Sequence, residues 1–456
     1  MKYDILVIGA GASGLMAAYS AASSAAAKGT DLRVCVLEKM PRPGRKIMIT
    51  GKGRCNFTNM KDWNAFSAHV RSGSQFLRSA FYSLPPERLA DFFNRHGMDS
   101  VVERGDRAYP ASYRSSDVVD TLVNACHGAG VVIQTEAEVA AVEKQADGFK
   151  VALADGTEHK CGKLIVATGG LSYPVTGSTG DGFRWARELG HSVTPLFPSL
   201  TALVPKGYKM PAEAGHNGNL PHHIARETPM TELGQKLCGI SLKNIIATLL
   251  IQGDSAGQEF GDIDFTDGGI EGPIGFQLSR KAVKAIINGS RVSLVLDLKP
   301  GVGLTDLTTR VKELWEEIAR DPRSARIKEK ERCRILLGKL MPWDLIPAFT
   351  ASHPEIITLE RRGRADTKVW VNLVSIAKAL KEWRFDIAGY VGWERAVVTA
   401  GGVSLDEIVP KTLESKLVPG LYFCGEALDI DADTGGYNLQ LAFCTGWLAG
   451  QNASYR

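Results

Sequence analysis

The sequence predicts an α/β fold in which both ends of the chain build one doubly wound, mainly parallel sheet. Residues 3–38 have the pattern of a strand, a helix and a second strand. Short apolar strands separated by polar loops follow from about 199 to 300, which favours a barrel-like insert. Strand patterns return near the C-terminus, so the domain that begins the chain also ends it. We therefore expect four segments: 1–195 and 385–456, the two parts of the sheet domain, 196–300, a β-barrel-like insert, and 301–384, a small helical domain.

The first strand runs into a glycine-rich turn that is a strong local signal. The segment YDILVIGAGASG places G-x-G-x-x-G at Gly9, Gly11 and Gly14, directly before a helix of small residues that starts with Ala12 and Ser13. The first glycine permits the tight turn, the second lets a pyrophosphate approach the backbone, and the third lets the helix pack on the strand. The helix N-terminus adds unpaired N–H groups. An ordinary glycine-rich turn is the alternative, but the flanking strand and helix favour a dinucleotide site.

Glu38 closes the next strand, in the segment LRVCVLEK, and Lys39 follows it. An acid at this position accepts hydrogen bonds from both ribose hydroxyls of an adenosine. The same carboxylate would repel a phosphate on the 2′ position. We therefore expect the ligand of the glycine-rich turn to be FAD or NAD and not NADP.

Composition limits the remaining possibilities. At 456 residues the chain exceeds the size at which a single hydrophobic core stops growing, so two or three domains are expected. A hydrophobic content of 44% and a charged content of 23% are typical of a soluble globular protein. The mild net charge of +4 gives no reason to invoke nucleic acid or an anionic membrane. We expect neither as a partner, and the oligomeric state stays open.

The chain also lacks the sequence signals of export. Asp4 precedes the first apolar run and glycines interrupt it, so it does not read as a secretory signal. No other segment approaches the roughly 18 consecutive apolar residues of a membrane-spanning helix. The eight cysteines are scattered and form no C-x-x-C pair, which is typical of reduced thiols. A cytoplasmic protein is therefore expected.

A long glycine-rich and basic stretch, PRPGRKIMITGKGRCNFTN, follows the second strand. Its glycines at positions 44, 51 and 53 oppose a stable helix or central strand. Because long loops inside compact domains are often functional, and because this one mixes apolar side chains with Arg45 and Lys46, it is expected to cover a ligand. Helical patterns follow near 85–96 and 116–129. Two hairpins with Asp-Gly turns then lead to the buried strand KLIVATGG, which ends in Thr168, Gly169 and Gly170.

The insert and the C-terminal part have their own patterns. Two helical stretches, roughly 305–320 and 326–340, follow the expected barrel strands. Near the C-terminus an apolar strand leads to an acidic turn at Gly425 and Glu426, a Gly435-Gly436 turn and a last helix at 438–450. The N–H groups at the start of this helix could stabilise negative charge on a reduced flavin ring, which a nicotinamide ring would not require. A plain strand, turn and helix that completes the sheet is the alternative.

Five separated motifs together resemble the BaiN-like bacterial flavoproteins, a group that includes aminoacetone-oxidase-type enzymes. They occur in the order of that family: GAGASGLMAA, GRKIMITGKGRCNFTN, ATGG, VVTAGGVSLDEI and GLYFCGEALDIDADTGGYNLQLAFCTGWLAG. The resemblance spans both ends of the chain. It implies an FAD-dependent oxidoreductase with a split Rossmann-like domain, a β-barrel insert and a helical insert.

The resemblance also implies where FAD would be held. The phosphates would meet the turn that starts at Gly9, the adenosine ribose Glu38, the adenine the backbone of Val139, and the ring end the segment around Asn438. The basic loop would line the cofactor. The full set of expected cofactor-binding residues is Gly9, Gly11, Ala12, Ser13, Gly14, Glu38, Lys39, Arg45, Lys46, Thr50, Gly51, Val139, Thr168, Gly169, Gly170, Gly425, Glu426, Gly436, Tyr437, Asn438 and Leu439.

The chain departs from this family inside the insert. The segment FTDGGIEGP carries Asp267 and Glu271 where relatives often have a histidine and a serine, so their substrates do not transfer directly. Histidines 216, 222 and 223 lack cysteine or carboxylate partners at ligand spacing, and no metal is expected. Two basic runs, RSARIKEKERCR and ERRGRADTK, are read as solvated surfaces, with contact to RNA as the alternative.

The expected chemistry is flavin-mediated transfer of a hydride or electron pair with an unidentified small molecule. No second G-x-G-x-x-G follows the KLIVATGG strand, so NAD(P)H would dock only transiently as a donor. Cys55 and Cys424 are expected to be buried thiols and not a redox relay. No acid or base is nominated, although Tyr437 is expected to affect turnover while FAD stays bound. The alternatives are an oxygen-using amine oxidase, an RNA-modifying flavoprotein and a flavin-bound redox sensor.

Overall fold

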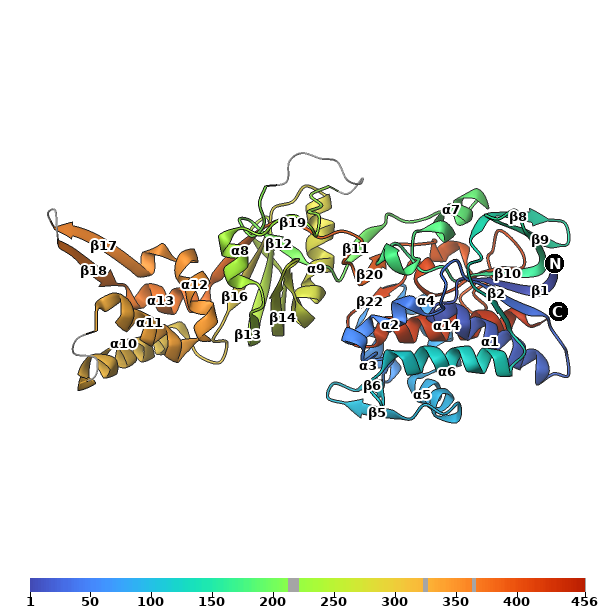
Figure 1. Cartoon of the computed structure of the whole chain (residues 1–456), viewed down its shortest axis with the longest axis horizontal. Coiled ribbons are helices and arrows are strands. Elements are labelled where there is room, and N and C mark those ends of the chain that lie inside the picture. Colours follow the sequence, from blue (N-terminus) through green and yellow to red (C-terminus); the bar gives the residue numbers. More distant parts are fainter. Residues whose placement is uncertain (212–220, 323–326, 363–365, 456) are drawn as a thin grey trace. The chain divides into compact units, whose positions relative to one another are not determined.

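The structure is a computed structural model in which the chain forms two compact units (Figure 1). Unit 1 contains Met1–Ser199 and Ala396–Arg456, and unit 2 contains Leu200–Arg395. Both ends of the chain therefore belong to one unit, as the sequence predicts. The finer division into four segments stays a prediction. The residues that the structure describes are 1–211, 221–322, 327–362 and 366–455.

Unit 1 is built around a mixed sheet whose strand β1 is apolar and buried from Ile5 to Ile8. Such a continuous apolar run fits a parallel strand that is covered on both faces. β1 pairs in parallel with β2 and β10, and β21 from the C-terminal part also pairs in parallel with β10. The remaining order is β7-β2-β1-β10-β9-β8. The strands are β1 (Lys2–Ile8), β2 (Val34–Leu37), β7 (Val132–Gln134), β8 (Val139–Gln145), β9 (Gly148–Leu153), β10 (Glu158–Val166) and β21 (Leu421–Phe423).

Helices cover this sheet, with α1, α6 and α14 on one side and α7 on the other (Figure 1). The predicted helices near 85–96 and 116–129 are α5 and α6. The helices of unit 1 are α1 (Ala12–Ala26), α2 (Arg45–Met48), α3 (Trp63–Ser67), α4 (Ser74–Ser83), α5 (Pro86–Arg95), α6 (Ser115–Gly128), α7 (Asp181–Glu188) and α14 (Tyr437–Ala453). Single 3-10 turns are η1 (Thr50–Gly53), η2 (Pro174–Thr176), η6 (Leu405–Glu407) and η7 (Gly425–Ala427).

Short strands complete unit 1. They form three small sheets in the order β3-β6-β5, β4-β22 and β11-β20. Their bounds are β3 (Thr58–Asn59), β5 (Ser100–Glu103), β6 (Arg107–Pro110), β4 (Val70–Ser72), β22 (Asp431–Ala432), β11 (Phe197–Ser199) and β20 (Val398–Ala400). The basic glycine-rich stretch forms two single turns, α2 and η1, where the sequence predicts only a loop. Gly44 has a φ of 68° before α2, and Gly51 has a φ of 56° inside η1, so neither turn extends into a longer helix.

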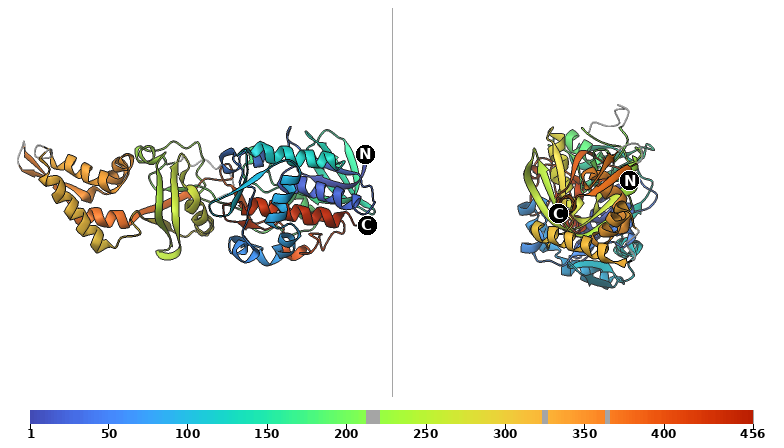
Figure 2. Two further views of the ribbon diagram at one scale, coloured as in Figure 1. Left: turned by 90° about the horizontal axis from the view of Figure 1, so that it is seen from below. Right: turned by 90° about the vertical axis from the view of Figure 1, so that its left-hand side faces the viewer.

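α1 and α14 pack at backbone contact, although they come from opposite ends of the chain. A Cβ atom on Gly446 would lie 2.2 Å from the carbonyl oxygen of Ser13, and one on Gly450 would lie 2.0 Å from that of Ala17. Only glycine fits at these separations. Figure 2 shows the two helices running alongside each other, α1 in blue and α14 in red. The small residues that the sequence places along α1 therefore form the surface on which α14 packs.

Unit 2 contains a closed barrel of short and long strands in the order β12-β15-β14-β13-β16-β19. The strand β19 follows the helices in sequence and closes the barrel by pairing with β12 and β16. The barrel strands are β12 (Leu203–Pro205), β13 (Ser241–Ile251), β14 (Asp254–Thr266), β15 (Gly269–Glu271), β16 (Val292–Asp297) and β19 (Trp383–Tyr390). The barrel prediction is thereby confirmed.

Helices and one hairpin complete unit 2. The predicted helices at 305–320 and 326–340 are α10 and α11, whereas α9 was not predicted because Gly272, Pro273 and Gly275 at its start resemble a turn. The helices are α8 (Glu232–Leu237), α9 (Gly272–Ile287), α10 (Leu304–Arg320), α11 (Glu329–Leu340), α12 (Ile346–Ser352) and α13 (Leu373–Lys381). The remaining elements are η4 (Trp343–Leu345), η5 (Pro354–Ile356) and the hairpin β17 (Ile357–Arg362) with β18 (Asp366–Val371). Among the described residues, every helix is too short or too polar to cross a bilayer.

The contact between α1 and α14 gives a stability prediction. Gly446→Ala places a methyl group against the backbone of α1, and we expect it to destabilise the protein by about 1–3 kcal/mol. The midpoint of thermal unfolding should fall by about 2–4 °C for each kcal/mol. Gly128→Ala is the matched control, because Gly128 is also helical and a Cβ atom there meets no atom within 4 Å. An unchanged midpoint for Gly446→Ala would contradict the packing described above.

Candidate functional site

A pocket of unit 1 lies where the glycine-rich turn, the basic loop and the start of α14 meet. Residues from both ends of the chain line it, so a ligand there would contact segments more than 400 residues apart in sequence, from Gly9 to Leu439. Most of the residues expected to bind the cofactor are among the lining residues. These are Gly9, Gly11, Ala12, Ser13, Glu38, Lys39, Arg45, Lys46, Thr50, Val139, Thr168, Gly169, Gly425, Glu426, Asn438 and Leu439.

The other expected residues are not among the lining residues, and three of them are glycines where another part of the chain packs too closely for a Cβ atom. A Cβ atom on Gly14 would lie 1.8 Å from the carbonyl oxygen of Gly9, as the predicted helix packing requires. A Cβ atom on Gly170 would lie 2.3 Å from Oγ1 of Thr399, and one on Gly436 would lie 2.5 Å from the carbonyl oxygen of Thr58. These glycines pack the segments that surround the pocket.

Tyr437 and Gly51 also lie outside the lining residues. The ring of Tyr437 is 4% exposed and stacks on the ring of His69, with centroids 4.4 Å apart. Burial and the nearby Asp433 carboxylate raise the pKa of Tyr437 to about 12, so its hydroxyl is protonated at neutral pH. Tyr437 therefore belongs to an aromatic cluster beside the pocket, and its expected effect on turnover stays a prediction.

The glycine-rich turn has the shape of a phosphate cradle. Gly9 has a φ of 101°, and a Cβ atom there would lie 2.6 Å from the carbonyl oxygen of Ala167. At Gly11, by contrast, a Cβ atom would meet no protein atom within 4 Å. The space beside Gly11 is thus open toward the pocket. α1 begins directly after it, with no acidic residue in its first turn, and its first N–H groups are unpaired helix donors.

The carboxylate of Glu38 is fixed at the end of β2 by two backbone donors. Its Oε2 accepts a hydrogen bond from the N–H of Ala10 at 2.8 Å, and its Oε1 accepts one from the N–H of Met40 at 2.8 Å. Each oxygen can still accept a further hydrogen bond. The geometry is what recognition of a ribose diol requires.

The neighbouring Lys39 reaches across to α7. Its Nζ lies 2.6 Å from Oδ2 of Asp181, and it also donates to the hydroxyl of Thr179. Burial opposes the charged form of Asp181, but the hydrogen bonds from Lys39 and Thr179 outweigh it and hold its pKa below the ordinary value. The pair therefore joins two lining segments, from β2 and from α7, as a charged link.

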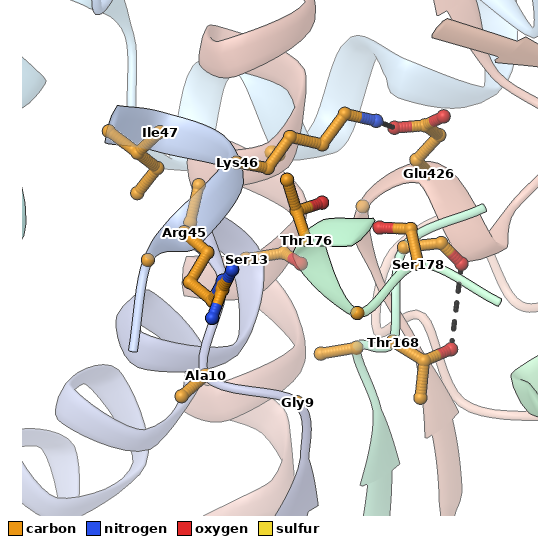
Figure 3. Close-up of a pocket in the computed structure, with 18 of the residues that line it drawn as sticks. Gly9, Ala10, Ser13, Arg45, Lys46, Ile47, Thr168, Thr176, Ser178 and Glu426 are labelled. Carbon is orange, nitrogen blue, oxygen red and sulfur yellow. Dashed lines mark hydrogen bonds and ion pairs between the residues drawn. The ribbon is translucent and has the colours of Figure 1, made fainter. Parts of the chain in front are cut away.

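At the other end of the pocket, Lys46 and Glu426 form an ion pair (Figure 3). Nζ of Lys46 lies 2.7 Å from Oε2 of Glu426. The other oxygen, Oε1, accepts hydrogen bonds from the N–H of Thr399 and from the hydroxyl of Ser172, each at 2.7 Å. Four segments that are distant in sequence therefore meet at Glu426, and its charge is balanced by Lys46.

The side chain of Asn438 has a structural task. Its Oδ1 accepts from the N–H of Ala432 at 2.9 Å, and its Nδ2 donates to the carbonyl oxygens of Ala432 at 2.8 Å and Asp433 at 3.1 Å. These bonds hold the loop that leads into α14. Asn438 thus fixes the position of the helix start that faces the pocket.

Sequence reasoning missed one group of lining residues, which follows the ATGG strand end. They lie in the segment SYPVTGSTGDG and on α7, where neither a helix nor a motif is predicted from the sequence. The density of Gly, Ser, Thr and Pro directly after a strand end was the signal that could have identified them. The lining residues of this group are Thr176, Gly177, Ser178, Asp181 and Trp185.

Comparison with known proteins assigns the chain to a family. The family model described as HI0933-like protein Rossmann domain matches residues 3–452. The chain belongs to this family. It is thereby an FAD-dependent oxidoreductase with a Rossmann-like domain, and the resemblance to BaiN-like flavoproteins is confirmed.

Three curated relatives match this flavoprotein over nearly their whole length. A 3-dehydro-bile acid delta(4,6)-reductase from Clostridium scindens is 30% identical over 99% of this chain and 98% of the relative. A ribosomal RNA dihydrouridine synthase from Escherichia coli is 28% identical over 99% of this chain and 98% of the relative. A protein of the same name from Haemophilus influenzae is 30% identical over 97% of this chain and 96% of the relative.

Asp267 and Glu271, the two carboxylates of unit 2 that the sequence singles out, both accept hydrogen bonds from one arginine. Arg395 donates from Nη1 to Asp267 at 2.6 Å and from Nε and Nη2 to the carboxylate of Glu271. Nε of Arg226 also lies 3.3 Å from Oδ2 of Asp267, so two guanidinium groups face the two carboxylates within unit 2. His223 lies 3.0 Å from Glu394, and His216 lies outside the described residues.

Cys55 and Cys424, which lie within two of the family motifs, are buried. Burial raises the pKa of Cys55 to about 12 and that of Cys424 to about 12. Both thiols are therefore protonated at neutral pH and are poor nucleophiles. This agrees with the expectation of packed thiols.

We predict that the folded protein reacts with a thiol reagent such as DTNB at about one site at pH 8. Cys238 is half-buried, whereas the other cysteines are buried. Cys238 should therefore account for the fast reaction of the folded protein with DTNB. This fast reaction should disappear in Cys238→Ser, and the remaining thiols should react only after unfolding. The measurement is the absorbance of released thionitrobenzoate, and fast reaction of several thiols in the folded protein would contradict it.

Proposed function

We propose that this flavoprotein reduces a carbon–carbon double bond that is conjugated to a carbonyl group. The names of its full-length relatives support this chemistry. A delta(4,6)-reductase of a 3-dehydro-bile acid and a dihydrouridine synthase both saturate such a bond, in a steroid ring and in a uracil ring. The two molecules share no scaffold, but in each the alkene is electron-poor and accepts a hydride. The preferred substrate class is a small molecule of the enone type.

We propose that FAD lies along the pocket, with its pyrophosphate beside Gly11 and the start of α1. Its ribose would be held by Glu38, its adenine by the backbone of Val139, and its ring end by the segment of Glu426 and Leu439. The open space at Gly11 and the pre-positioned carboxylate of Glu38 support this fit. Bound FAD supplies the hydride chemistry, and the protein supplies binding, orientation and electrostatics.

The residues of the ring end have separate roles in this proposal. The N–H groups at the start of α14 favour negative charge near them, because they are unpaired helix donors at the positive end of the helix dipole. Asn438 keeps that helix start in place through its bonds to Ala432. The ion pair of Lys46 with Glu426 keeps a cation beside the ring end while the pair as a whole stays neutral.

NAD(P)H is proposed as the electron donor. The chain has no second glycine-rich dinucleotide turn after the KLIVATGG strand, so the donor would dock transiently on the flavin. Glu38 gives no preference between NADH and NADPH, since it belongs to the FAD site.

A uridine of ribosomal RNA is the second candidate substrate. It is supported by the two relatives that are named for this reaction and that match nearly the whole chain. The mild net charge of +4 argues for the small molecule. The proposed bond chemistry is the same for both candidates.

The position of FAD gives a testable prediction. Gly11→Ala adds a methyl group that meets no protein atom within 4 Å, so the apoprotein should keep its thermal stability. The methyl group would lie where the pyrophosphate is proposed, and we expect the Kd for FAD to rise at least about 10-fold. Titration of the apoprotein with FAD, followed by flavin fluorescence, measures this. Gly128→Ala is the control, and normal FAD affinity in folded Gly11→Ala would rule out the proposed position.

The reaction itself is tested with anaerobic protein. NADH or NADPH should bleach the flavin, and a 3-oxo-4,6-diene steroid should restore its colour and gain two hydrogens by mass spectrometry. Uridine in a ribosomal RNA fragment that restores the colour in place of the steroid would select the second candidate. Bleaching by a primary amine with peroxide release in air, and no reaction with either alkene, would show an amine oxidase and overturn the proposal.

A further inference from the structure

Trp185 combines three properties that together indicate contact with a ligand. It lines the pocket, its side chain is only 2% exposed, and its indole Nε1–H has no hydrogen-bond partner among the described residues. An indole N–H can only donate a hydrogen bond. Because buried polar groups are nearly always satisfied, an unpaired buried donor on a pocket-lining residue points to an acceptor that a ligand supplies.

The neighbours of Trp185 identify which end of the pocket it faces. It lies on α7 one turn after Asp181, so the two side chains share one face of the helix. Asp181 is paired with Lys39, which follows the ribose-binding candidate Glu38. On the other flank, Arg184 donates to the carbonyl oxygen of Ala140 at 3.2 Å, next to Val139. Trp185 therefore lies at the adenosine end.

α7 is held tightly in this position. A Cβ atom on Gly182 would lie 2.2 Å from Oγ1 of Thr168 at the end of the KLIVATGG strand. The guanidinium of Arg184 lies over the Trp185 ring, 5.4 Å from its centroid. α7 is thus held against the strand end and β8 by Gly182 and Arg184, and neither contact uses the indole N–H of Trp185.

We propose that Trp185 donates its indole N–H to the adenosine half of FAD, to a ring nitrogen of adenine or an oxygen of the ribose. This makes Trp185 a recognition residue for the dinucleotide, in addition to the glycine-rich turn and Glu38. Other buried groups without a partner, such as the ring nitrogens of His159 and the hydroxyl of Tyr390, are not among the pocket-lining residues. The inference rests on FAD as the cofactor and is independent of the substrate class.

The test compares Trp185→Phe with wild type, using FAD, ADP and FMN as ligands of the apoprotein. Phenylalanine keeps an aromatic ring but removes the donor. Loss of one hydrogen bond should raise the Kd for FAD and for ADP about 5- to 10-fold. FMN lacks the adenosine half, so its Kd should not change. Trp447→Phe is the matched control, because Trp447 lies on α14 of the same unit and is not a lining residue.

Two results would overturn the inference. Trp185→Phe that binds FAD and ADP like wild type would show that the N–H has no ligand acceptor. An equal loss of FMN affinity would show general damage to the pocket and no adenosine recognition. These binding constants do not depend on turnover, so failure of the proposed reaction would leave them unaffected.

A second measurement covers the case in which Trp185→Phe does not fold. In wild-type apoprotein labelled with nitrogen-15, ADP should shift an indole N–H resonance that FMN leaves in place. Trp185 is the tryptophan among the described lining residues, which identifies the signal. If ADP binds and no indole resonance moves, the proposal is wrong.

Discussion

The backbone contact between α1 and α14 is the constraint on which the site depends. The carbonyl oxygens of Ser13 and Ala17 lie so close to the Cα atoms of Gly446 and Gly450 that no Cβ atom fits between them. Two helices from opposite ends of the chain can then lie side by side with their N-termini at one pocket. Because β21 also joins β10 in parallel, the sheet and the helix layer impose the same arrangement. A bulkier residue at either glycine would separate both helix starts from each other.

The pocket also has an oriented carboxylate at each end, Glu38 at one and Glu426 at the other. Glu38 is oriented by two backbone N–H groups, whereas Glu426 is oriented by a backbone N–H, a hydroxyl and the ammonium of Lys46. The first carboxylate keeps acceptor capacity for hydroxyl groups. The second is neutralised. This difference suits a ligand with a sugar at one end and an electron-rich ring at the other, and it follows from which donors each turn presents.

The sequence predicts most of the frame but only part of the site. Apolar runs and glycine spacing predict β1, α1, β2 and the start of α14, because local physics decides these elements. The strand β19 and helix α9 could not be predicted, since barrel closure is a long-range pairing and α9 starts with turn-forming residues. Trp185 could not be predicted either, because it lies on α7, and a helix of only 8 residues gives a weak periodic signal in the sequence. Gly14 and Gly436 could be recognised as special, but whether a glycine lines a pocket or packs behind it depends on its neighbours.

In the proposed function, one fold could act on chemically different substrates because the FAD site sets few requirements for the substrate. In the proposed function, the residues of unit 1 that surround the pocket would hold and polarise FAD, and the reaction would then require only an alkene activated by a carbonyl. Selection between a small molecule and a nucleotide in RNA must come from other residues. In unit 2, the two guanidinium groups of Arg395 and Arg226 pair with the two carboxylates of Asp267 and Glu271, so this cluster carries no net charge. A neutral cluster of this kind attracts charged molecules only weakly.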